Sequence, residues 1–571
     1  MNGFVFELNG AKKDSLLLKN AEKQLIGEAF CEYSKLQKFQ NDKLFFVKEN
    51  QMVLLDGVIF NKKNLIESSQ RENLWSEVYC RLVLEDDDYI NKLRGSFCGI
   101  VFDMSKMKLE AFTNHSGEKA VYFYHRDDLL IVTSHMELMK EALIHNGQPL
   151  QPNIQACQEM LSTGSMLHGN TILKNAYRIM PGCKIIFFDG VLSNIRYHMF
   201  HNIPEQELSL EECIDEADRL FRNAVDRIFS KNLEYGYQAE ADLSGGLDSR
   251  LVTWVAHDLG YKNILNVCYC QKGKIDHMTS RKIAEKLGNQ YVFYPMNGGD
   301  FFMDVDEMTR KTGGQVFYGV CTGANRTFRL IDTSNIGLAV TGLLGELHNA
   351  YWTEGDCHTN PAYINERYTY TPKLSLPEEY KAGYDNYEQM NLYEYSALLF
   401  LSSAFARQDL MEVYSPFIDK DYLEFVYKIP LKWRKHYFFT MNWILTKYPD
   451  AAKFVWQTKE KPVDKAYYQK IYAPKIMWDC QDYLKRIYNK LCRIFKIHSA
   501  LTLKREMNPI ETWYLRNPKL RKFLNDYYEK YRYIISDDDL KNNIQKCHES
   551  RLGMDKIMIV NLLSIMREYF S

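Results

Sequence analysis

The segment Asp242-Leu243-Ser244-Gly245-Gly246-Leu247-Asp248-Ser249 decides how this chain is interpreted. It joins an expected buried strand to an expected helix, and its two glycines let the backbone turn tightly against a ligand. The N–H groups that open such a helix, with the nearby hydroxyls, favour phosphate or pyrophosphate. Asp248 would repel a bare polyphosphate, so a hard cation such as Mg²⁺ is expected between them. The segment therefore predicts a metal-nucleotide site, with a purely structural turn as the alternative.

The motif Ser-Gly-Gly-Leu-Asp-Ser resembles the pyrophosphate loop of the ATP-pyrophosphatase ligases, and within them that of the asparagine synthetase family. It lacks the Gly-Lys-Ser/Thr ending of a Walker A loop. The resemblance implies that ATP is cleaved to AMP and pyrophosphate while a carboxylate is activated as its acyl-adenylate. The residues assigned to ATP are Leu243, Ser244, Gly245, Gly246, Asp248, Ser249, Tyr269, Thr341 and Gly342.

The resemblance assigns Mg²⁺ to Asp248 and Glu346. The second carboxylate belongs to Thr341-Gly342-Leu343-Leu344-Gly345-Glu346, which by its position resembles the family's second nucleotide loop. Glu346 replaces the usual aspartate with one methylene more of reach, and Leu344 stands where a glycine is common. A plain turn into a helix is the alternative for this segment.

Two lysines are candidates for the charged group that acts on the phosphates. The family keeps a lysine over the pyrophosphate and the acyl phosphate, and Lys459 occupies that position, with Lys461 as the second choice. An ammonium suits this task because it is a mobile point charge facing developing negative charge. A solvated loop lysine is the alternative for either residue.

Glu394 is the candidate for a proton acceptor in the amide-forming step. An incoming amine must lose a proton before or during its attack, and a nearby acid–base pair promotes this. The β-lactam synthetase branch of the family uses a tyrosine and a glutamate, but Leu343 stands where that tyrosine would be. Glu394, flanked by Tyr393 and Tyr395 on an expected helix over 392–405, is the nearest substitute. The alternative is that these are ordinary residues on a helix surface.

The first two hundred residues have mainly β patterns. Segments 45–47 and 52–55 flank Glu49-Asn50 as in a hairpin, and stretches at 97–102, 120–124 and 129–132 continue the pattern, with short helices at 64–67 and 74–84. Three further segments resemble the glutaminase domain of asparagine synthetases, which is an αββα sandwich with an N-terminal nucleophile. They are Asp56 to Asn61, Leu93 to Phe97 and Gly117 to Tyr122.

Three departures predict that this domain does not hydrolyse glutamine. Position 2 is Asn2 rather than the nucleophilic cysteine, and the first arginine that could clamp a substrate carboxylate is Arg71. The family's Asn-Gly pair, which supplies an oxyanion donor, is here Asp56-Gly57, and a carboxylate would repel the oxyanion. Cys31 lacks an adjacent α-amine, so we expect it to be a buried structural thiol.

We therefore expect two domains, an inactive glutaminase-like domain over 1–200 and an adenylating synthetase domain over 205–571. A capping box at Ser209 to Glu212 opens the second domain. The alternation of strands and helices after it predicts a parallel sheet with crossover helices. The fold class is thus α/β and α+β: an N-terminal αββα Ntn-type sandwich followed by a parallel-sheet α/β ATP-pyrophosphatase domain with a helical C-terminus. Residues 483–495 form a basic amphipathic pattern, which predicts a surface helix, with docking of an acidic substrate or carrier as the less favoured interpretation.

The balanced charge of the chain limits the binding partners that we expect. With 72 basic and 73 acidic side chains, no net field attracts nucleic acid or a membrane surface. We expect a small-molecule or peptide carboxylate as substrate, with a partner protein that could deliver it. The 13 cysteines are an odd number, and only Cys268 and Cys270 are closely spaced, without a second pair at metal-ligand spacing. This favours free thiols in a reducing cytoplasm.

The sequence favours an ATP-dependent, AMP-forming amide ligase whose amine does not come from glutamine. In character it is similar to lasso-peptide cyclases and β-lactam synthetases, which close rings within one substrate. Asparagine synthesis is the alternative in the same class, using free ammonia, or glutamine if the N-terminal domain is active. A nucleotide-binding pseudoenzyme or scaffold is the alternative from another class.

Overall fold

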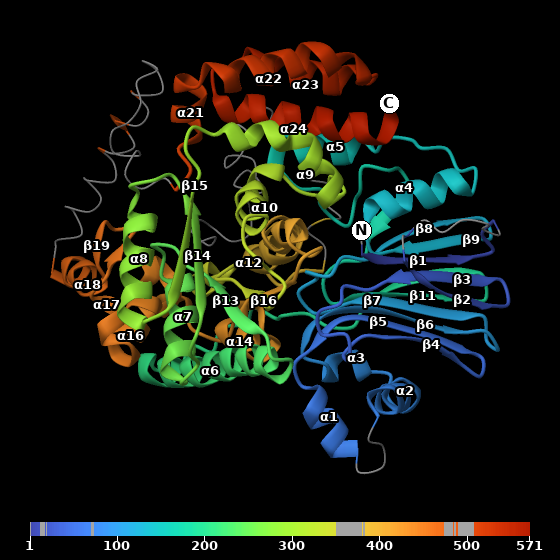
Figure 1. Cartoon of the computed structure of the whole chain (residues 1–571), viewed down its shortest axis with the longest axis horizontal. Helices are drawn as coiled ribbons and strands as arrows, with labels where there is room; N and C mark the ends of the chain where they lie inside the picture. The colour runs from blue at the N-terminus through green and yellow to red at the C-terminus, as the bar shows by residue number, and fades with distance from the viewer. Residues whose placement is uncertain are drawn as a thin grey trace.

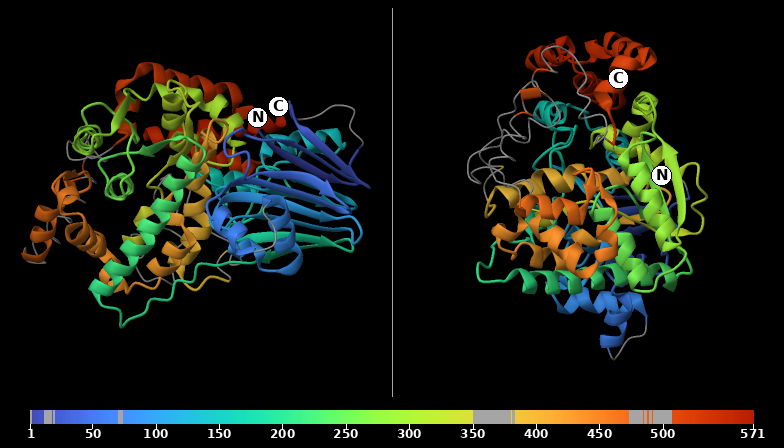
Figure 2. Two further views of the ribbon diagram at one scale, coloured as in Figure 1. Left: turned by 60° about the horizontal axis from the view of Figure 1, so that its bottom comes forward. Right: turned by 90° about the vertical axis from the view of Figure 1, so that its left-hand side faces the viewer.

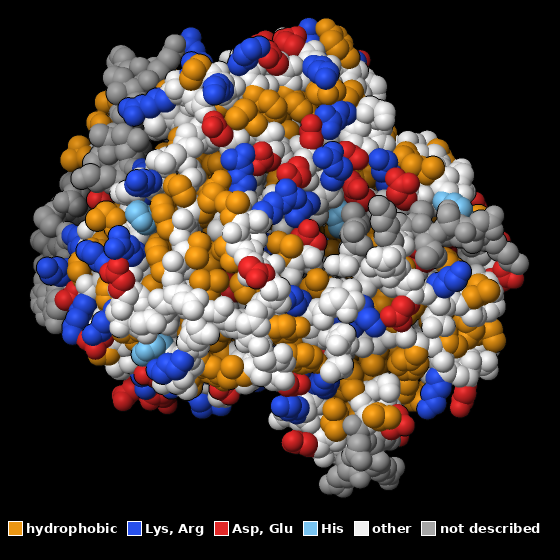
Figure 3. All heavy atoms as spheres, in the orientation of Figure 1, with side chains coloured by type: hydrophobic (Ala, Val, Ile, Leu, Met, Phe, Trp, Pro, Cys, Tyr) orange, Lys and Arg blue, Asp and Glu red, His pale blue; other side chains and the backbone are white. Residues whose placement is uncertain are grey.

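The computed structural model describes residues 2–11, 20–69, 74–349, 383–472 and 507–571, with Leu18, Tyr380, Leu484, Ile487, Tyr488 and Leu491. Arg71 and most of the helix predicted over 483–495 lie outside the described residues. Two domains stand side by side, and the C-terminal helices lie across both (Figure 1). Basic and acidic side chains are interspersed on the face shown in Figure 3. Within the described ranges, no helix is both long and apolar enough to cross a bilayer.

The N-terminal domain contains two stacked antiparallel sheets. One has the strand order β10-β8-β9-β1-β3-β2 and the other β12-β11-β7-β6-β5-β4. Alternate side chains of β1 and β6, among them Phe6 and Phe102, pack between the sheets. The strands are β1 Gly3–Leu8, β2 Glu22–Ile26, β3 Ala29–Ser34, β4 Leu44–Lys48, β5 Gln51–Ile59, β6 Gly95–Asp103, β7 Lys108–Thr113, β8 Tyr122–Arg126, β9 Leu129–Thr133, β10 Ala176–Arg178, β11 Cys183–Phe188 and β12 Val191–Arg196.

Helices cover the outer face of each sheet, so the domain is an αββα sandwich (Figure 1). Helices α4 (Met136–His145) and α5 (Ile154–Thr163) pack over the first sheet. Helices α1 (Lys62–Ser69), α2 (Trp75–Glu85) and α3 (Tyr89–Lys92) cover the second. The predicted hairpin at Glu49-Asn50 is β4 paired with β5, and Cys31 is fully buried in β3 as expected.

The second domain is organised around a parallel sheet with the strand order β15-β14-β13-β16-β17. Helix α6 (Leu210–Glu234) begins at the predicted Ser209 capping box. The chain then runs through β13 (Gln238–Asp242), α7 (Asp248–Asp258), β14 (Leu265–Cys270), α8 (Ile275–Leu287) and β15 (Gln290–Pro295). It returns to the other side of β13 for β16 (Ile336–Val340) and β17 (Glu412–Tyr414).

The remaining elements are mostly helical. The C-terminal helix α24 packs on α9 and α5, and Lys140 of α4 forms an ion pair with Glu568 at 3.6 Å, so the last helices join the two domains (Figures 1 and 2). These elements are η1 Asp300–Asp304, α9 Val305–Thr312, η2 Tyr318–Val320, α10 Thr322–Phe328, η3 Gly345–Asn349, α12 Tyr387–Asn391, η8 Pro416–Ile418, α14 Lys420–Val426, α15 Leu431–Arg434, η9 Lys435–Tyr437, α16 Phe438–Lys447, α17 Pro449–Ala452, β18 Val455–Trp456, β19 Lys461–Pro462, α18 Val463–Tyr472, α21 Ile510–Arg516, α22 Pro518–Tyr531, η10 Arg532–Ile534, α23 Asp538–Glu549 and α24 Gly553–Phe570.

The helix predicted over 392–405 is irregular, and the alternative that its residues lie on a helix surface is wrong. The segment is divided into a π-helical turn Leu392–Ser396 (η6), α13 (Ala397–Leu399) and a 3₁₀ stretch Leu401–Ala406 (η7). It is also buried, because it lies between the domains and Leu398 enters the core of the N-terminal sandwich. A segment packed on several sides shows no amphipathic period from which its burial could be predicted.

Four charged side chains form a buried ion-pair cluster between the domains. Lys119 Nζ lies 3.2 Å from Asp56 Oδ2 and 2.8 Å from Glu412 Oε2. Lys43 Nζ lies 3.0 Å from Glu412 Oε1, and Tyr33 donates to Asp56 Oδ1 at 2.6 Å. Burial alone would raise the pKa of Asp56, but Lys119 and Lys43 outweigh it and lower the pKa to about 2. Asp56 is therefore ionised at neutral pH, and its charge pairs with two buried ammonium groups.

We predict that Asp56→Asn lowers the free energy of unfolding by about 3 kcal/mol, because it leaves two buried ammonium groups with one carboxylate. Asp189→Asn, at an exposed turn position with positive φ, is the matched control and should be neutral. Because the folded pKa of Asp56 is below its unfolded value, its contribution is present above about pH 4 and is lost as the pH falls towards 2. Denaturant unfolding at pH 7 and pH 3 measures this. Equal stability of wild type and Asp56→Asn at pH 7 would contradict it.

Candidate active site

A cavity of about 240 Å³ lies at the carboxyl ends of three parallel strands. The chain moves outward from β13 to β14 and β15 and then returns to the other side of β13, so β13 and β16 flank the switch point of the sheet. Ligands bind at such points in open parallel sheets. The lining residues are Asp242, Leu243, Ser244, Gly246, Asp248, Ser249, Val267, Cys268, Tyr269, Thr341, Gly342, Leu343 and Met507. All the predicted nucleotide residues except Gly245 are among them.

The loop after β13 holds its shape through its own hydroxyls. Ser249 Oγ accepts from the Ser244 N–H at 3.0 Å and lies 2.9 Å from Ser244 Oγ. Ser244 Oγ in turn accepts from the Gly246 N–H at 3.1 Å. Helix α7 begins at Asp248, so its first turn opens directly beside the cavity. The serines predicted as ligands thus also preorganise the turn.

Asp276 is a neighbour of this loop that the sequence analysis missed. Its Oδ1 accepts from the Gly245 N–H at 3.0 Å, and a Cβ at Gly245 would lie 3.1 Å from the Asp276 Cα. Its Oδ2 has no hydrogen-bond partner within the described chain, and burial raises the pKa of this carboxyl. Asp276 therefore holds the glycine of the loop against the start of α8. No spacing in the sequence indicates this contact.

Asp248 has the properties expected of a ligand for a hard cation. It lines the cavity, and its Oδ1 lacks a hydrogen-bond partner in the described ranges while lying 3.4 Å from Nε2 of the buried His348. No described cluster of three or more His, Cys, Asp or Glu could hold a metal alone. The donor set fits Mg²⁺ that keeps water and nucleotide oxygens as its other ligands. His348 was not identified from the sequence, because only the fold brings it near α7.

The second glycine-containing loop packs directly on the first. A Cβ at Gly342 would lie 2.6 Å from the Ser249 backbone nitrogen, and one at Gly345 would lie 2.5 Å from Asp248 Cβ. Glycine is thus required at both positions for the two loops to meet. Thr341 and Gly342 line the cavity, whereas Glu346 is not among the lining residues. Its predicted role as the second magnesium ligand stays a prediction.

Arg250 joins the loop to the segment that carries the candidate lysines. Its guanidinium is fully buried and donates to the carbonyl oxygens of Gly245, Ala451, Phe454 and Val455, at 2.8–3.3 Å. Burial lowers the pKa of Arg250 to about 9. These bonds fix the strand β18 beside the loop from the inside of the protein.

Lys459 and Lys461 lie in the short hairpin β18–β19, where Trp456 pairs with Lys461. The Gln457 N–H donates to the Gly245 carbonyl at 3.1 Å, so the hairpin contacts the loop through its backbone. The structure therefore brings the predicted lysine segment to the predicted phosphate loop across more than two hundred residues. Neither lysine is among the residues that line the cavity.

Glu394 lies away from the cavity, at the junction between the two domains. Its Oε1 accepts from the Tyr384 hydroxyl at 2.5 Å, and its Oε2 accepts from the His168 N–H at 2.6 Å. Tyr393 accepts from the Phe200 N–H at 2.8 Å. These contacts belong to the junction with the N-terminal domain, and Glu394 does not line the cavity. The structure does not bring it together with the other predicted site residues.

Asp242 and Tyr269 both line the cavity. Arg407, from the segment ahead of β17, is buried and donates to both oxygens of Asp242, at 3.3 and 3.0 Å. Burial raises the pKa of Tyr269, and the nearby Asp242 adds to this shift. The phenol therefore stays protonated and can donate a hydrogen bond.

A second pocket, of about 270 Å³, lies where a glutaminase would have its nucleophile. Its lining includes Asn2, Asp56, Cys98 and Lys119. Burial raises the pKa of the Cys98 thiol, and the negative charge of Asp56 raises it further. A protonated thiol is a poor nucleophile. The pocket thus remains open, while Asp56 and Lys119 in its lining take part in the interdomain ion pairs.

A family model described as "Glutamine amidotransferase domain" matches residues 37–141, so this region is glutamine amidotransferase-like. Among solved structures, the allosteric regulatory enzyme of purine biosynthesis is 10% identical, with coverage of 51% of this chain and 74% of that one and a TM-score of 0.24. Glutamine phosphoribosylpyrophosphate amidotransferase from B. subtilis is 11% identical, with coverage of 51% and 84% and a TM-score of 0.23. A search of curated proteins finds no match.

We predict that Arg250→Met lowers the unfolding free energy by about 3 kcal/mol, because buried carbonyl oxygens lose their donor. It should also weaken ATP binding, since the loop and hairpin lose their shared anchor. Arg219→Met, which removes an exposed arginine paired only with Glu216 of the same helix, is the control and should change stability by less than about 1 kcal/mol. Thermal unfolding and calorimetric titration with ATP measure both effects. Wild-type ATP affinity in Arg250→Met would refute the anchoring role.

We also predict that the protein releases no ammonia from glutamine, and that Asn2→Cys does not create this activity. Asp56 would still present an anion where an oxyanion must be stabilised. A coupled glutamate or ammonia assay on wild type, Asn2→Cys and Asn2→Cys/Asp56→Asn measures this. Glutamine hydrolysis by the wild type at a rate comparable with its ATP turnover would show the prediction to be wrong.

Proposed function

We propose that this protein is an ATP-dependent amide-forming ligase that adenylates a carboxylate, releasing pyrophosphate, and then couples it to an amine. The observation that carries the proposal is the Leu243–Ser249 loop at the switch point of the parallel sheet, with Asp248 beside the cavity and the lysine hairpin bonded to Gly245. A strand, a glycine-containing turn and a helix start in this order suit a pyrophosphate group. A purely structural turn does not require the acidic and basic residues that surround this one.

Each part of the site would have its own role in binding ATP, Mg²⁺ or the leaving pyrophosphate. The loop and the first turn of α7 would bind the phosphates, while Ser244 and Ser249 keep the loop in its binding shape. Asp248 would hold Mg²⁺, which neutralises phosphate charge when bound. Thr341 and Gly342 would pack against the nucleotide from the second loop, and Tyr269 would donate from the facing wall. Lys459 or Lys461 would face the charge that develops on the leaving pyrophosphate.

We place the chain with the asparagine synthetase family, as a glutaminase-like region over 1–200 followed by an adenylating domain over 205–571. The glutamine amidotransferase match at 37–141 supports the first part of this arrangement. The Ser-Gly-Gly-Leu-Asp-Ser motif supports the second. Because the N-terminal pocket lacks a cysteine at position 2, the amine would come from free ammonia or from the substrate itself. The second case is ring closure, as in lasso-peptide cyclases and β-lactam synthetases.

A glutamine-dependent reaction is the second candidate, and the amidotransferase match is the observation that favours it. Asn2 and the charged Asp56 argue against it, because they remove the nucleophile and the oxyanion donor. A base for the amide step has no strong candidate in the described cavity, since Glu394 binds Tyr384 and His168 elsewhere. An amine that enters in its neutral form would need none.

The test of the proposal is pyrophosphate release from ATP with Mg²⁺ and candidate carboxylates. We predict that Asp248→Asn lowers the rate at least about 100-fold, because it removes a charged contact to the metal nucleotide while keeping the side-chain volume. Asp258→Asn, at the other end of α7 and paired with Arg222 at the surface, is the matched control and should keep full activity. Glu346→Gln should act like Asp248→Asn if Glu346 is the second ligand. Unchanged metal-dependent release in Asp248→Asn would refute the assignment.

A further inference from the structure

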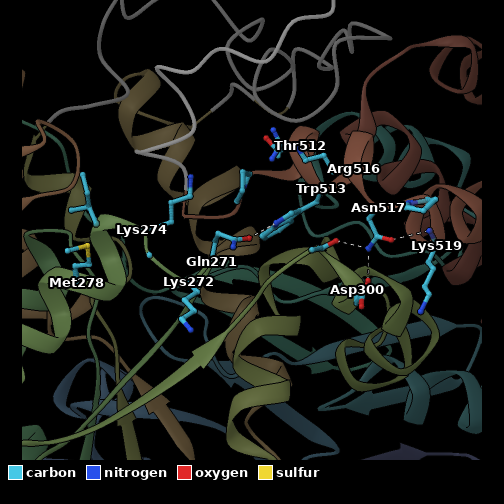
Figure 4. Close-up of a pocket in the computed structure, with 15 residues that line it drawn as sticks. Gln271, Lys272, Lys274, Met278, Asp300, Thr512, Trp513, Arg516, Asn517 and Lys519 are labelled. Atoms are coloured by element: carbon cyan, nitrogen blue, oxygen red, sulfur yellow. Dashed lines mark hydrogen bonds between the residues drawn. The ribbon is translucent and has the colours of Figure 1, made fainter.

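A larger cavity lies beside the nucleotide cavity and has no role in the reaction as proposed. It measures about 830 Å³, which is within the range of pockets that hold drug-sized ligands. The segment after β14 and the start of α8 form one side, and Asp300, from the segment after β15, lies with helices α21 and α22 on the other (Figure 4). The residues that the argument uses are Gln271, Lys272, Lys274, Trp513, Arg516 and Lys519.

Hydrogen bonds between residues that line the cavity hold its walls in place. The Trp513 indole donates to Gln271 Oε1 at 2.8 Å, and its ring packs edge-on against Phe301 at 5.3 Å. Asn517 donates to the Gly298 carbonyl at 2.8 Å and to Asp300 Oδ1 at 2.6 Å. Residues from distant parts of the sequence thus fix the two sides relative to each other. The cavity is therefore a preformed site.

The cavity and the nucleotide site share their structural supports. The Gln271 N–H donates to the Met507 carbonyl at 3.2 Å, and Met507 lines the nucleotide cavity. Ile275 lines the large cavity, while the next residue, Asp276, binds the Gly245 N–H of the phosphate loop. A ligand in the large cavity would thus lie next to the site where a carboxylate is activated.

The charges of the cavity are mainly positive and lie on opposite sides. Lys272 and Lys274 stand on one side, and Arg516 and Lys519 on the other (Figure 4). The single carboxylate, Asp300, already accepts from Asn517. Lys272, Arg516 and Lys519 form no ion pair with another described residue. A phosphate group needs donors that converge on one point, whereas separated cations suit several carboxylates along an extended ligand.

We propose that this cavity binds an acidic peptide segment of the acyl substrate, remote from the carboxylate that is activated. The proposal rests on the proposed function for its link to catalysis, but the binding itself does not. Separated cations would pair with Asp or Glu side chains of the peptide, and apolar surface would cover the atoms between them. That surface comes from Ile275, Met278, Pro509, Trp513 and Pro518. This combination of apolar surface and separated charges matches the general make-up of protein interfaces.

The test is fluorescence anisotropy with a labelled hexapeptide that alternates Glu and Gly, measured against the full-length protein without ATP. We expect binding that weakens as salt rises, because exposed charges are screened. The variant Lys272→Glu/Arg516→Glu/Lys519→Glu should bind at least about tenfold more weakly at low salt, because three attractive charges become repulsive. The control variant Lys530→Glu/Lys546→Glu/Arg551→Glu changes net charge equally on exposed sites outside the cavity and should bind as wild type does.

Equal binding by the two triple variants would overturn the proposal, because it would show that net charge alone attracts the peptide. Tighter binding of inorganic pyrophosphate than of the peptide, lost in the cavity variant, would also overturn it and identify a phosphate site. Thermal unfolding of each variant checks that the fold is intact. ATP titration separates the two claims: peptide binding without ATP binding would contradict the proposed function and leave the peptide site standing.

Discussion

The buried guanidinium of Arg250 is the interaction on which the candidate active site depends. A charge removed from water is costly unless it is hydrogen-bonded, and Nη1 and Nη2 of Arg250 donate to carbonyl oxygens of Gly245 and of residues 451–455. Its buried Nε has no hydrogen-bond partner in the described part of the chain. The Leu243–Ser249 loop and the hairpin that carries Lys459 and Lys461 are therefore held in one fixed relation, and the loop also lines the cavity. Asp276 adds a second bond to Gly245 from α8. The loop is preorganised without any ligand.

The need to pair buried charges also explains the arrangement around Asp56 in the N-terminal pocket. The carboxylate of Asp56 cannot donate a hydrogen bond to an oxyanion. It instead pairs with Lys119 and Lys43, which both also pair with Glu412 on β17. Glu412 lies on the edge strand of the parallel sheet, so the cluster couples the pocket of one domain to the sheet of the other. Asp56 thus contributes, through Lys119 and Lys43, to the attachment of the N-terminal domain to the parallel sheet.

Much of the fold could be predicted because it follows from local patterns. The hairpin at Glu49-Asn50 and the capping box at Ser209 are set by neighbouring residues, and the alternation of strands and helices fixes the parallel sheet. The partners Asp276, His348 and Arg250 could not be predicted, because only tertiary folding brings them to the loop. The irregular geometry of segment 392–405 and its position between the domains could not be predicted for a related reason, because burial on several sides leaves no period to detect. Glu394 was expected at the reaction centre as the nearest substitute once Leu343 replaced the family's tyrosine, and it lies at the domain junction instead.

The most direct test of the central claim is the identity of the nucleotide products. ³¹P NMR of the protein with ATP, Mg²⁺ and a pool of acidic peptides distinguishes cleavage at the α-phosphate from cleavage at the γ-phosphate. The account predicts AMP and pyrophosphate in equal amounts, because the loop at Leu243–Ser249 is interpreted as a pyrophosphate site. Release of ADP and phosphate would contradict it.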